Sequence, residues 1–163
     1  TGKQQIQAST TVFVQFRDLL RSACIALAKM IARDGEGAEK LIEATVEGAA
    51  TKQDARTIAL NIINSPLIKT AIHGADPNWG RVIMAVGKDH RCQVDPKRID
   101  LRFDTEGILQ NGEQLPFDRA RLVALLKQEH VKIYVNLHLG EGSATAWGCD
   151  LTMGYIKINT DYS

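Results

Sequence analysis

Residues 131–139 constrain the fold more than any other segment, because apolar and polar side chains alternate along the whole stretch. A period of two residues is typical of a strand that buries one face and exposes the other. Residues 42–46 alternate in the same way, with Glu43 and Thr45 at the polar positions. Such strands need a layer that covers their apolar face, so we expect a sheet combined with covering elements.

Three other segments have the three- and four-residue spacing of amphipathic helices. The first covers residues 12–30 and is expected to end near Asp34 and Gly35, since glycine adopts the left-handed cap conformation without strain. The second, residues 52–64, follows Thr51 as its N-cap, and the third follows Asp118. Residues 67–72 are compatible with a short helix or with a buried strand.

Three shorter patterns predict the remaining strands and turns. Residues 99–103 alternate as a strand, Asn111-Gly112 predicts a hairpin turn, and a last strand is expected over residues 151–158. Residues 1–10 predict a loop. The order of elements predicts an α+β fold in one domain over residues 1–163, with a mainly antiparallel sheet that carries helices on one face.

The composition is that of an ordinary soluble globular protein, with 44% hydrophobic and 24% charged residues. A net charge of +1 without a Lys/Arg cluster argues against nucleic-acid binding. Cys24, Cys92 and Cys149 are widely spaced, which indicates a reducing compartment and neither a disulfide framework nor a zinc site. No apolar run approaches ~18 residues and no signal-peptide pattern is present. We therefore expect a cytoplasmic protein, or one of an organelle matrix in a eukaryote, without membrane contact.

Residues 74–81 concentrate unusual side chains in one short loop. Asp76 is placed to accept hydrogen bonds from the next helical turn, with Pro77 as its first helical residue. In one interpretation this is only a capped helix start, with Trp79 packed in the core. In the other, the turn presents backbone N–H groups and Arg81 to a carboxylate ligand. The local pattern leaves both interpretations open.

Glu36 lies between two glycines at the expected junction of the first helix and the following strand. It is either a solvated turn residue or a carboxylate held where the backbone can approach a ligand closely. The sequence contains no metal-ligand spacing and no phosphate-binding loop, and Cys149 has no base partner in the sequence. Thr1 could act as an N-terminal nucleophile, but a catalytic N-terminus needs burial and residues 1–5 predict a polar loop.

Three motifs, read together and in order, resemble one protein family. The first is IARDGEGAEK at residues 31–40, and the second is SPLIKTA at 65–71 running into GADPNWGR at 74–81. The third is SATAWGCDLT at 143–152, followed by YIKIN at 155–159. From about residue 12 onward, the chain resembles the β subunit of ornithine acetyltransferase, the arginine-biosynthesis protein also called glutamate N-acetyltransferase.

The resemblance implies an acyltransferase activity and two site residues. Members of this family move an acetyl group from N-acetylornithine to glutamate through an acetyl-threonine, on a threonine that self-cleavage of the precursor exposes. Two threonines of the α subunit are thought to form the oxyanion hole. The substrate-binding glutamate and asparagine of the family correspond to Glu36 and Asn159, and Arg81 is a secondary candidate for a substrate carboxylate. No metal or cofactor is expected, apart from acetyl-CoA as a substrate in some members.

The resemblance also implies partners and a larger fold. The family assembles two α and two β chains, and its fold is a four-layer α/β sandwich to which this chain would supply one sheet and its helices. Thr1 corresponds to a position downstream of the family's cleavage site, so the nucleophile is expected upstream of this chain. The family closes with one more substrate-binding hydroxyl residue beyond the position of Ser163, so we expect this chain alone to be inactive. The alternative is a non-catalytic amino-acid-binding or assembly module of the same fold.

Overall fold

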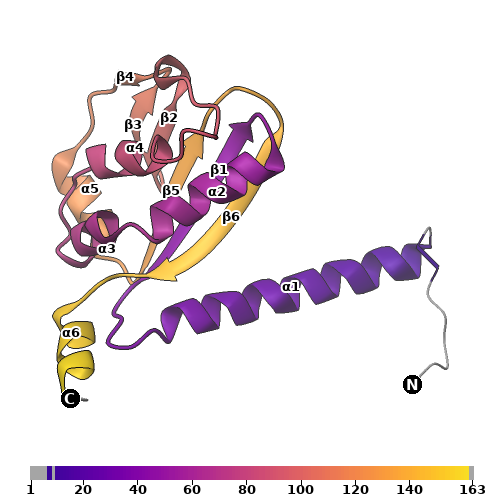
Figure 1. The fold of residues 1–163 in the computed structure, drawn as a ribbon, viewed down its shortest axis with the longest axis horizontal. Helices are drawn as coiled ribbons and strands as arrows, with labels where there is room; N and C mark the ends of the chain where they lie inside the picture. The colour runs from indigo at the N-terminus through magenta and orange to yellow at the C-terminus, as the bar shows by residue number, and fades with distance from the viewer. Residues whose placement is uncertain (1–6, 9, 162–163) are drawn as a thin grey trace.

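The chain adopts a mixed α+β fold, described by a computed structural model for residues 7–8 and 10–161 (Figure 1). Within those residues it contains six α-helices, the 3-10 helix η1 (Pro96–Arg98) and one sheet of six strands. The helices are α1 (Thr11–Arg33), α2 (Lys52–Ile63), α3 (Pro66–His73), α4 (Gly80–Val86), α5 (Arg119–Leu126) and α6 (Met153–Thr160). The strands are β1 (Leu41–Ala49), β2 (Asp100–Phe103), β3 (Glu106–Gln110), β4 (Glu113–Gln114), β5 (His130–Asn136) and β6 (Gly142–Cys149). The loop predicted over residues 1–10 falls largely outside the described residues, as do Thr1 and Ser163.

The sheet has the strand order β4-β3-β2-β5-β1-β6. β1 pairs in parallel with β5, whereas the pairs β1–β6, β2–β3, β2–β5 and β3–β4 are antiparallel. The prediction of a mainly antiparallel sheet is therefore confirmed. The β1–β5 register places Ile42 opposite Val131 and Ala44 opposite Ile133, so the apolar positions of both alternating segments share one face.

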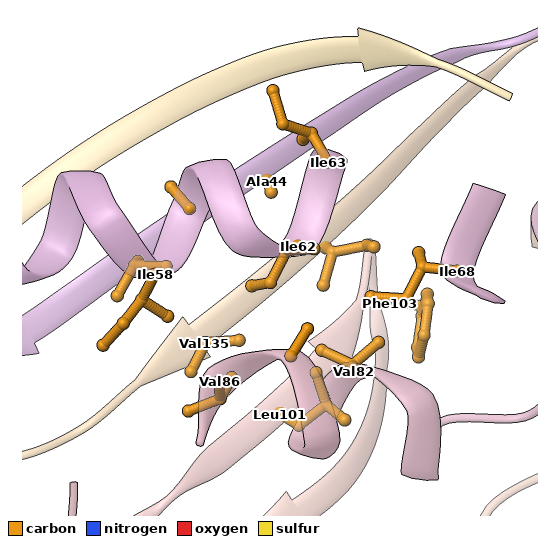
Figure 2. Close-up of a cluster of buried hydrophobic side chains, with 14 of the residues drawn as sticks. Ala44, Ile58, Ile62, Ile63, Ile68, Val82, Val86, Leu101, Phe103 and Val135 are labelled. Atoms are coloured by element: carbon orange, nitrogen blue, oxygen red, sulfur yellow. The ribbon is translucent and has the colours of Figure 1, made fainter. Parts of the chain in front are cut away.

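One face of this sheet forms the hydrophobic core (Figure 2). Ile42, Ala44 and Val46 of β1 are fully buried and belong to the same cluster as side chains of α2, α3, α4 and α5. Ile62 of α2 and Val82 of α4 are directed into this cluster in Figure 2. Burying one such aliphatic side chain contributes roughly 1.5–3 kcal/mol, so these contacts hold the helices on the sheet.

Helix α1 differs from the other helices that were predicted, because none of its residues is buried. It extends away from the rest of the fold below β6 (Figure 1), and its apolar side chains, including Phe16 and Leu19, are exposed. Its second half contacts the sheet face opposite the core, where Lys29 Nζ lies 2.7 Å from Glu43 Oε2 and 5.7 Å from the centre of the Trp147 ring. The prediction of helices on one face therefore holds for α2 to α5.

Glu43 joins four elements on this second face of the sheet. Its carboxylate accepts a hydrogen bond from Trp147 Nε1 at 2.9 Å and pairs with Lys29. His130 Nε2 lies 3.2 Å away, close enough for an ion pair but without hydrogen-bond geometry. Burial raises the pKa of the Glu43 carboxyl, but the hydrogen bonds from Lys29 and Trp147 and the charges of Lys29 and His130 outweigh it. The pKa of Glu43 is therefore lowered from its ordinary value.

Lys40 lies directly before β1 and joins the ends of two helices. Its Nζ donates hydrogen bonds to the carbonyl oxygens of Ile72 at 2.7 Å, His73 at 3.2 Å and Leu126 at 2.9 Å. These residues end α3 and α5, where the last carbonyl groups have no partner within their own helix. The ammonium also suits the negative ends of both helix dipoles.

One predicted strand and one predicted helix cap are wrong. Residues 151–158 lie mostly in helix α6 and not in a strand, because the Thr152 hydroxyl caps the helix and accepts a backbone N–H at 3.1 Å. Helix α4 begins at Gly80, and Asp76 does not cap it, since the N-cap is Trp79 and makes no side-chain cap hydrogen bond. Trp79 packs half-buried against the core, as one interpretation expected.

Other local predictions are confirmed. Thr51 and Asp118 cap α2 and α5 through their side chains. The undecided residues 67–72 are helical, because Ser65 caps α3. Asn111 and Gly112 turn the β3–β4 hairpin with φ angles of 49° and 75°. No helix in the described part of the chain has the length and apolar character to cross a membrane.

Replacing Glu43 by Gln should lower the free energy of unfolding by about 1–3 kcal/mol at neutral pH, because an ionised acceptor is lost. The pKa of Glu43 is lowered in the folded protein, so its ionisation stabilises the fold above the ordinary value of 4.5. This contribution is lost as the pH falls through the lowered pKa. Urea unfolding of both forms at several pH values should show a difference that shrinks below about pH 4.

Glu47→Gln is the matched control for this measurement. Glu47 lies on the same face of the same strand but is exposed, so its replacement should change the free energy of unfolding by less than about 0.5 kcal/mol. Equal losses in the two variants would contradict the role of the Glu43 contacts.

Candidate functional site

The Gly35-Glu36-Gly37 corner connects α1 to the sheet. Helix α1 ends at Arg33, and Glu36 is exposed in the turn that follows. Gly37 has a φ of +63°, a left-handed conformation that L side chains rarely adopt. A Cβ at Gly37 would lie 2.5 Å from the backbone N of Tyr155 and 2.6 Å from the carbonyl carbon of Gly154. The glycine therefore allows the corner to pack directly against the start of α6.

Two side chains of the segment between β6 and α6 fix this contact. The Thr152 hydroxyl donates to Gly37 O at 2.6 Å while it caps α6. Asp150 Oδ1 accepts hydrogen bonds from the backbone N–H groups of Glu39 at 2.9 Å and Lys40 at 3.0 Å. The Asp150 side chain is fully buried. The corner and α6 are thus held together by hydrogen bonds between distant parts of the sequence.

The two substrate-binding residues implied by the resemblance lie side by side in this arrangement. Asn159 Nδ2 donates to Glu36 Oε2 at 3.0 Å and to the backbone oxygen of Tyr155 at 2.8 Å. Both side chains are exposed, so a small molecule can reach them. Their role in binding a substrate stays a prediction, although the fold brings them together from positions 123 residues apart.

The chemistry of this pair is that of an acceptor. The side-chain nitrogen of Asn159 donates to two protein oxygens, so a further hydrogen bond to this side chain would be accepted by its carbonyl oxygen. The Glu36 carboxylate also offers only acceptor positions when it is ionised. The pair therefore suits a cationic N–H group, such as the ammonium of an amino acid, better than it suits a carboxylate.

Arg81 makes no recorded contact with Glu36 or Asn159 in the described part of the chain. It lies on α4, where its Nη1 donates to the backbone oxygen of Leu67 at 2.6 Å and to the Thr70 hydroxyl at 3.4 Å. These contacts connect α4 to α3. Its Nη2 lies 3.9 Å from Asp76 Oδ2. A role for Arg81 in binding a substrate carboxylate stays a prediction.

A cavity of about 370 Å³ borders the corner on its other side. Its lining includes Gly35, Lys69, Trp147 and Cys149, with Lys69 Nζ 3.9 Å from Cys149 Sγ. Cys149, for which the sequence indicated no base partner, is half-buried and opens onto this cavity. Lys69 was not singled out from the sequence, because nothing local indicates that α3 turns it toward β6.

A further cavity of about 330 Å³ lies on the sheet face opposite the core, and Glu36 is not among its lining residues.

The chain belongs to the ArgJ family, whose family model matches residues 1–163. It is 46% identical over 161 residues to the arginine biosynthesis bifunctional protein ArgJ of Geobacillus kaustophilus, an alignment that covers 99% of this chain and 39% of the relative. The protein of the same name from Dehalococcoides mccartyi is 48% identical over 155 residues, covering 95% of this chain and 38% of the relative. The chain thus spans about two fifths of the length of these curated relatives.

A solved structure has the same fold. The crystal structure of the arginine biosynthesis bifunctional protein ArgJ from Bacillus halodurans superposes with a TM-score of 0.93 at 45% sequence identity, covering 98% of this chain and 75% of that chain. The resemblance expected from the three sequence motifs is therefore confirmed at the level of the family, and the α+β fold class is confirmed with it.

Gly37→Ala should weaken the attachment of α6. The left-handed backbone costs an alanine roughly 1–2 kcal/mol, and the added Cβ would meet backbone atoms of α6 that cannot move separately. Since α6 has no buried residue of its own, we expect its amides to exchange faster with deuterium while those of β1 stay protected.

Gly74→Ala is the control for this variant. Gly74 is the C-cap of α3. Its φ is −76°, and the nearest atom to an added Cβ is 3.6 Å away. Unchanged exchange in α6 of the Gly37 variant, or faster exchange in both variants, would contradict the packing role of Gly37.

Proposed function

We propose that this chain provides the substrate-binding part of an acetyltransferase of arginine biosynthesis, which moves an acetyl group from N-acetylornithine to glutamate. Membership of the ArgJ family supports the pathway and the reaction class. The single observation that supports the site is the hydrogen bond between Asn159 and Glu36 on an exposed surface of the fold. The alignments cover 39% and 38% of the two relatives, so the activity of the whole protein is part of this proposal.

The proposed reaction has two steps that share one covalent intermediate. A threonine hydroxyl attacks the acetyl carbonyl of N-acetylornithine, and the tetrahedral intermediate collapses with loss of ornithine, whose amine takes the proton. The amine of glutamate then attacks the acetyl-threonine ester, which yields N-acetylglutamate and restores the hydroxyl. The proposal assigns the nucleophilic threonine and the oxyanion hole to parts of the protein outside this chain, and gives Thr1 no catalytic role.

Glu36 and Asn159 would act by positioning the amino-acid substrates. Their oxygens form an acceptor pair that suits the ammonium of N-acetylornithine that carries no acetyl group. A fixed ammonium-binding pair orients the rest of the substrate, and correct orientation is a large part of the rate gain in acyl transfer. In the second step the same oxygens would accept hydrogen bonds from the glutamate amine, which has to lose a proton before it attacks the ester.

The proposal extends to the assembly of the whole enzyme. We propose that an α subunit from the same precursor completes the site, in a complex of two α and two β chains in the cytoplasm, with a four-layer α/β sandwich. No metal or cofactor takes part in the acetyl transfer, although acetyl-CoA is a second possible acetyl donor. The exposed apolar side chains of α1, such as Phe16 and Leu19, agree with a larger assembly.

Glu36→Ala and Asn159→Ala, made separately in the complete protein, should each lower kcat/KM for transfer to glutamate by about 10–100-fold. Loss of one hydrogen bond to a charged group costs about 1.5–3 kcal/mol, which gives this range. Both side chains are exposed, so thermal unfolding should show that the fold is kept. The double variant should lose less than the product of the single losses, since the two groups act as one pair.

Glu113→Ala provides the control, because Glu113 is an exposed carboxylate on β4. The acetyltransferase activity of this variant should equal that of the unaltered protein. Near-normal activity of both site variants would overturn the assignment of Glu36 and Asn159. Calorimetric binding of ornithine or glutamate without acetyl transfer by the complete protein would instead favour a non-catalytic amino-acid-binding module.

A further inference from the structure

Three potential metal ligands converge beside the Glu36 corner. Glu39 lies just before β1, His73 is the last residue of α3, and Asp150 follows β6. One ligand atom of each residue lies within 4.8 Å of the others. His73 Nδ1 is 3.3 Å from Asp150 Oδ2 and 3.6 Å from Glu39 Oε2. The sequence showed no metal-ligand spacing because these residues are far apart along the chain and only the fold brings them together.

His73 differs from the other histidines in that two carboxylates approach the same ring nitrogen: Nδ1 is hydrogen-bonded to Asp150 Oδ2 at 3.3 Å and lies 3.6 Å from Glu39 Oε2. In the described part of the chain, His138 Nε2 lies 2.7 Å from Asp100 Oδ2 and His130 Nε2 lies 3.2 Å from Glu43 Oε2, one carboxylate in each case. His73 is further from both of its carboxylates. Ligand atoms bound at about 2.0–2.2 Å around a tetrahedral metal ion lie about 3.3–3.6 Å apart, which is the spacing found around His73 Nδ1.

The Asp150 carboxylate is already oriented for such a role. Its Oδ1 accepts backbone N–H groups of Glu39 and Lys40, so Oδ2 is the oxygen directed at His73. Metal-binding carboxylates in proteins are usually held by hydrogen bonds of this kind. The nearby Lys40 ammonium is directed at three carbonyl oxygens, which include that of His73, and so fixes the end of α3.

We propose that Glu39, His73 and Asp150 bind one divalent transition-metal ion, with Zn²⁺ as the best match. Two carboxylates and one imidazole are hard and borderline ligands that Zn²⁺ accepts, and a water molecule would complete the tetrahedron. The two negative charges balance the charge of the ion. Asp150 is fully buried, whereas the side chains of His73 and Glu39 are 32% and 64% exposed, so the ion can enter from solvent.

A bound ion would connect the corner to α3. Glu39 is three residues after Glu36 in the same turn, so metal binding would restrict the segment that holds Glu36 against α6. The site is separate from the acetyl-transfer chemistry and gives the ion no part in it. Its existence therefore does not depend on the proposed function.

The test uses the complete protein, first treated with a chelator and then titrated with Zn²⁺ by calorimetry and with Co²⁺ by visible absorption. We expect one ion per chain at this site, with d–d bands of Co²⁺ in a low-symmetry environment. Glu39→Gln and His73→Gln should each weaken this binding by at least about 10-fold. Glu39 is exposed and its side chain is not needed for the backbone contacts of Asp150, so this variant should keep the fold.

His138→Gln is the matched control, since it removes a histidine that pairs with only one carboxylate. It should bind Zn²⁺ with the affinity of the unaltered protein. The proposal is overturned if the chelated protein takes up no ion, or if the ion that it takes up is retained equally by the Glu39, His73 and His138 variants. Activity assays are not needed for either outcome, so failure here leaves the proposed function untouched.

Discussion

The pairing of β1 with two strands from the end of the chain is the constraint on which the site depends. β1 lies between β5 and β6, with Leu41 opposite His130 on one side and Cys149 on the other. This register brings the turn before β1 to the end of β6. The Gly-Glu-Gly corner and helix α6 then meet without any contact that is local in sequence. The exposed pair of Glu36 and Asn159 is a consequence of this sheet register.

Local physics was enough to predict most helices and strands. The amphipathic spacing predicted α1 and α2 closely, and Thr51 and Asp118 were correctly identified as caps. Helix α6 was missed because Tyr155, Ile156 and Ile158 favour strands, and the helix buries none of its residues. Thr152 caps this helix, and its hydroxyl also donates a hydrogen bond to Gly37 O. That contact exists only in the folded chain.

The arrangement of the site could be predicted only in part. Glu36 and Asn159 were named from the resemblance, but nothing in the sequence showed that one hydrogen-bonds the other, because strand order is not encoded locally. The same holds for Glu39, His73 and Asp150. Arg81 was singled out as a group that the turn could present to a carboxylate ligand, whereas in the fold its Nη1 is directed at Leu67 and Thr70. The sequence indicated which polar side chains could bind a ligand, but it did not indicate which side chains contact one another.

The position of Lys40 has a consequence for how such a chain can change over evolution. One ammonium satisfies carbonyl groups at the ends of both α3 and α5, so a deletion or insertion at either helix end would move acceptors away from a side chain that β1 holds in place. Arginine is a poor substitute, because its planar donors cannot converge on three carbonyls in the same way. Changes in the lengths of α3 and α5 are therefore coupled, although the two helices are separated in sequence. Variation is expected to accumulate in the loops that follow these helices.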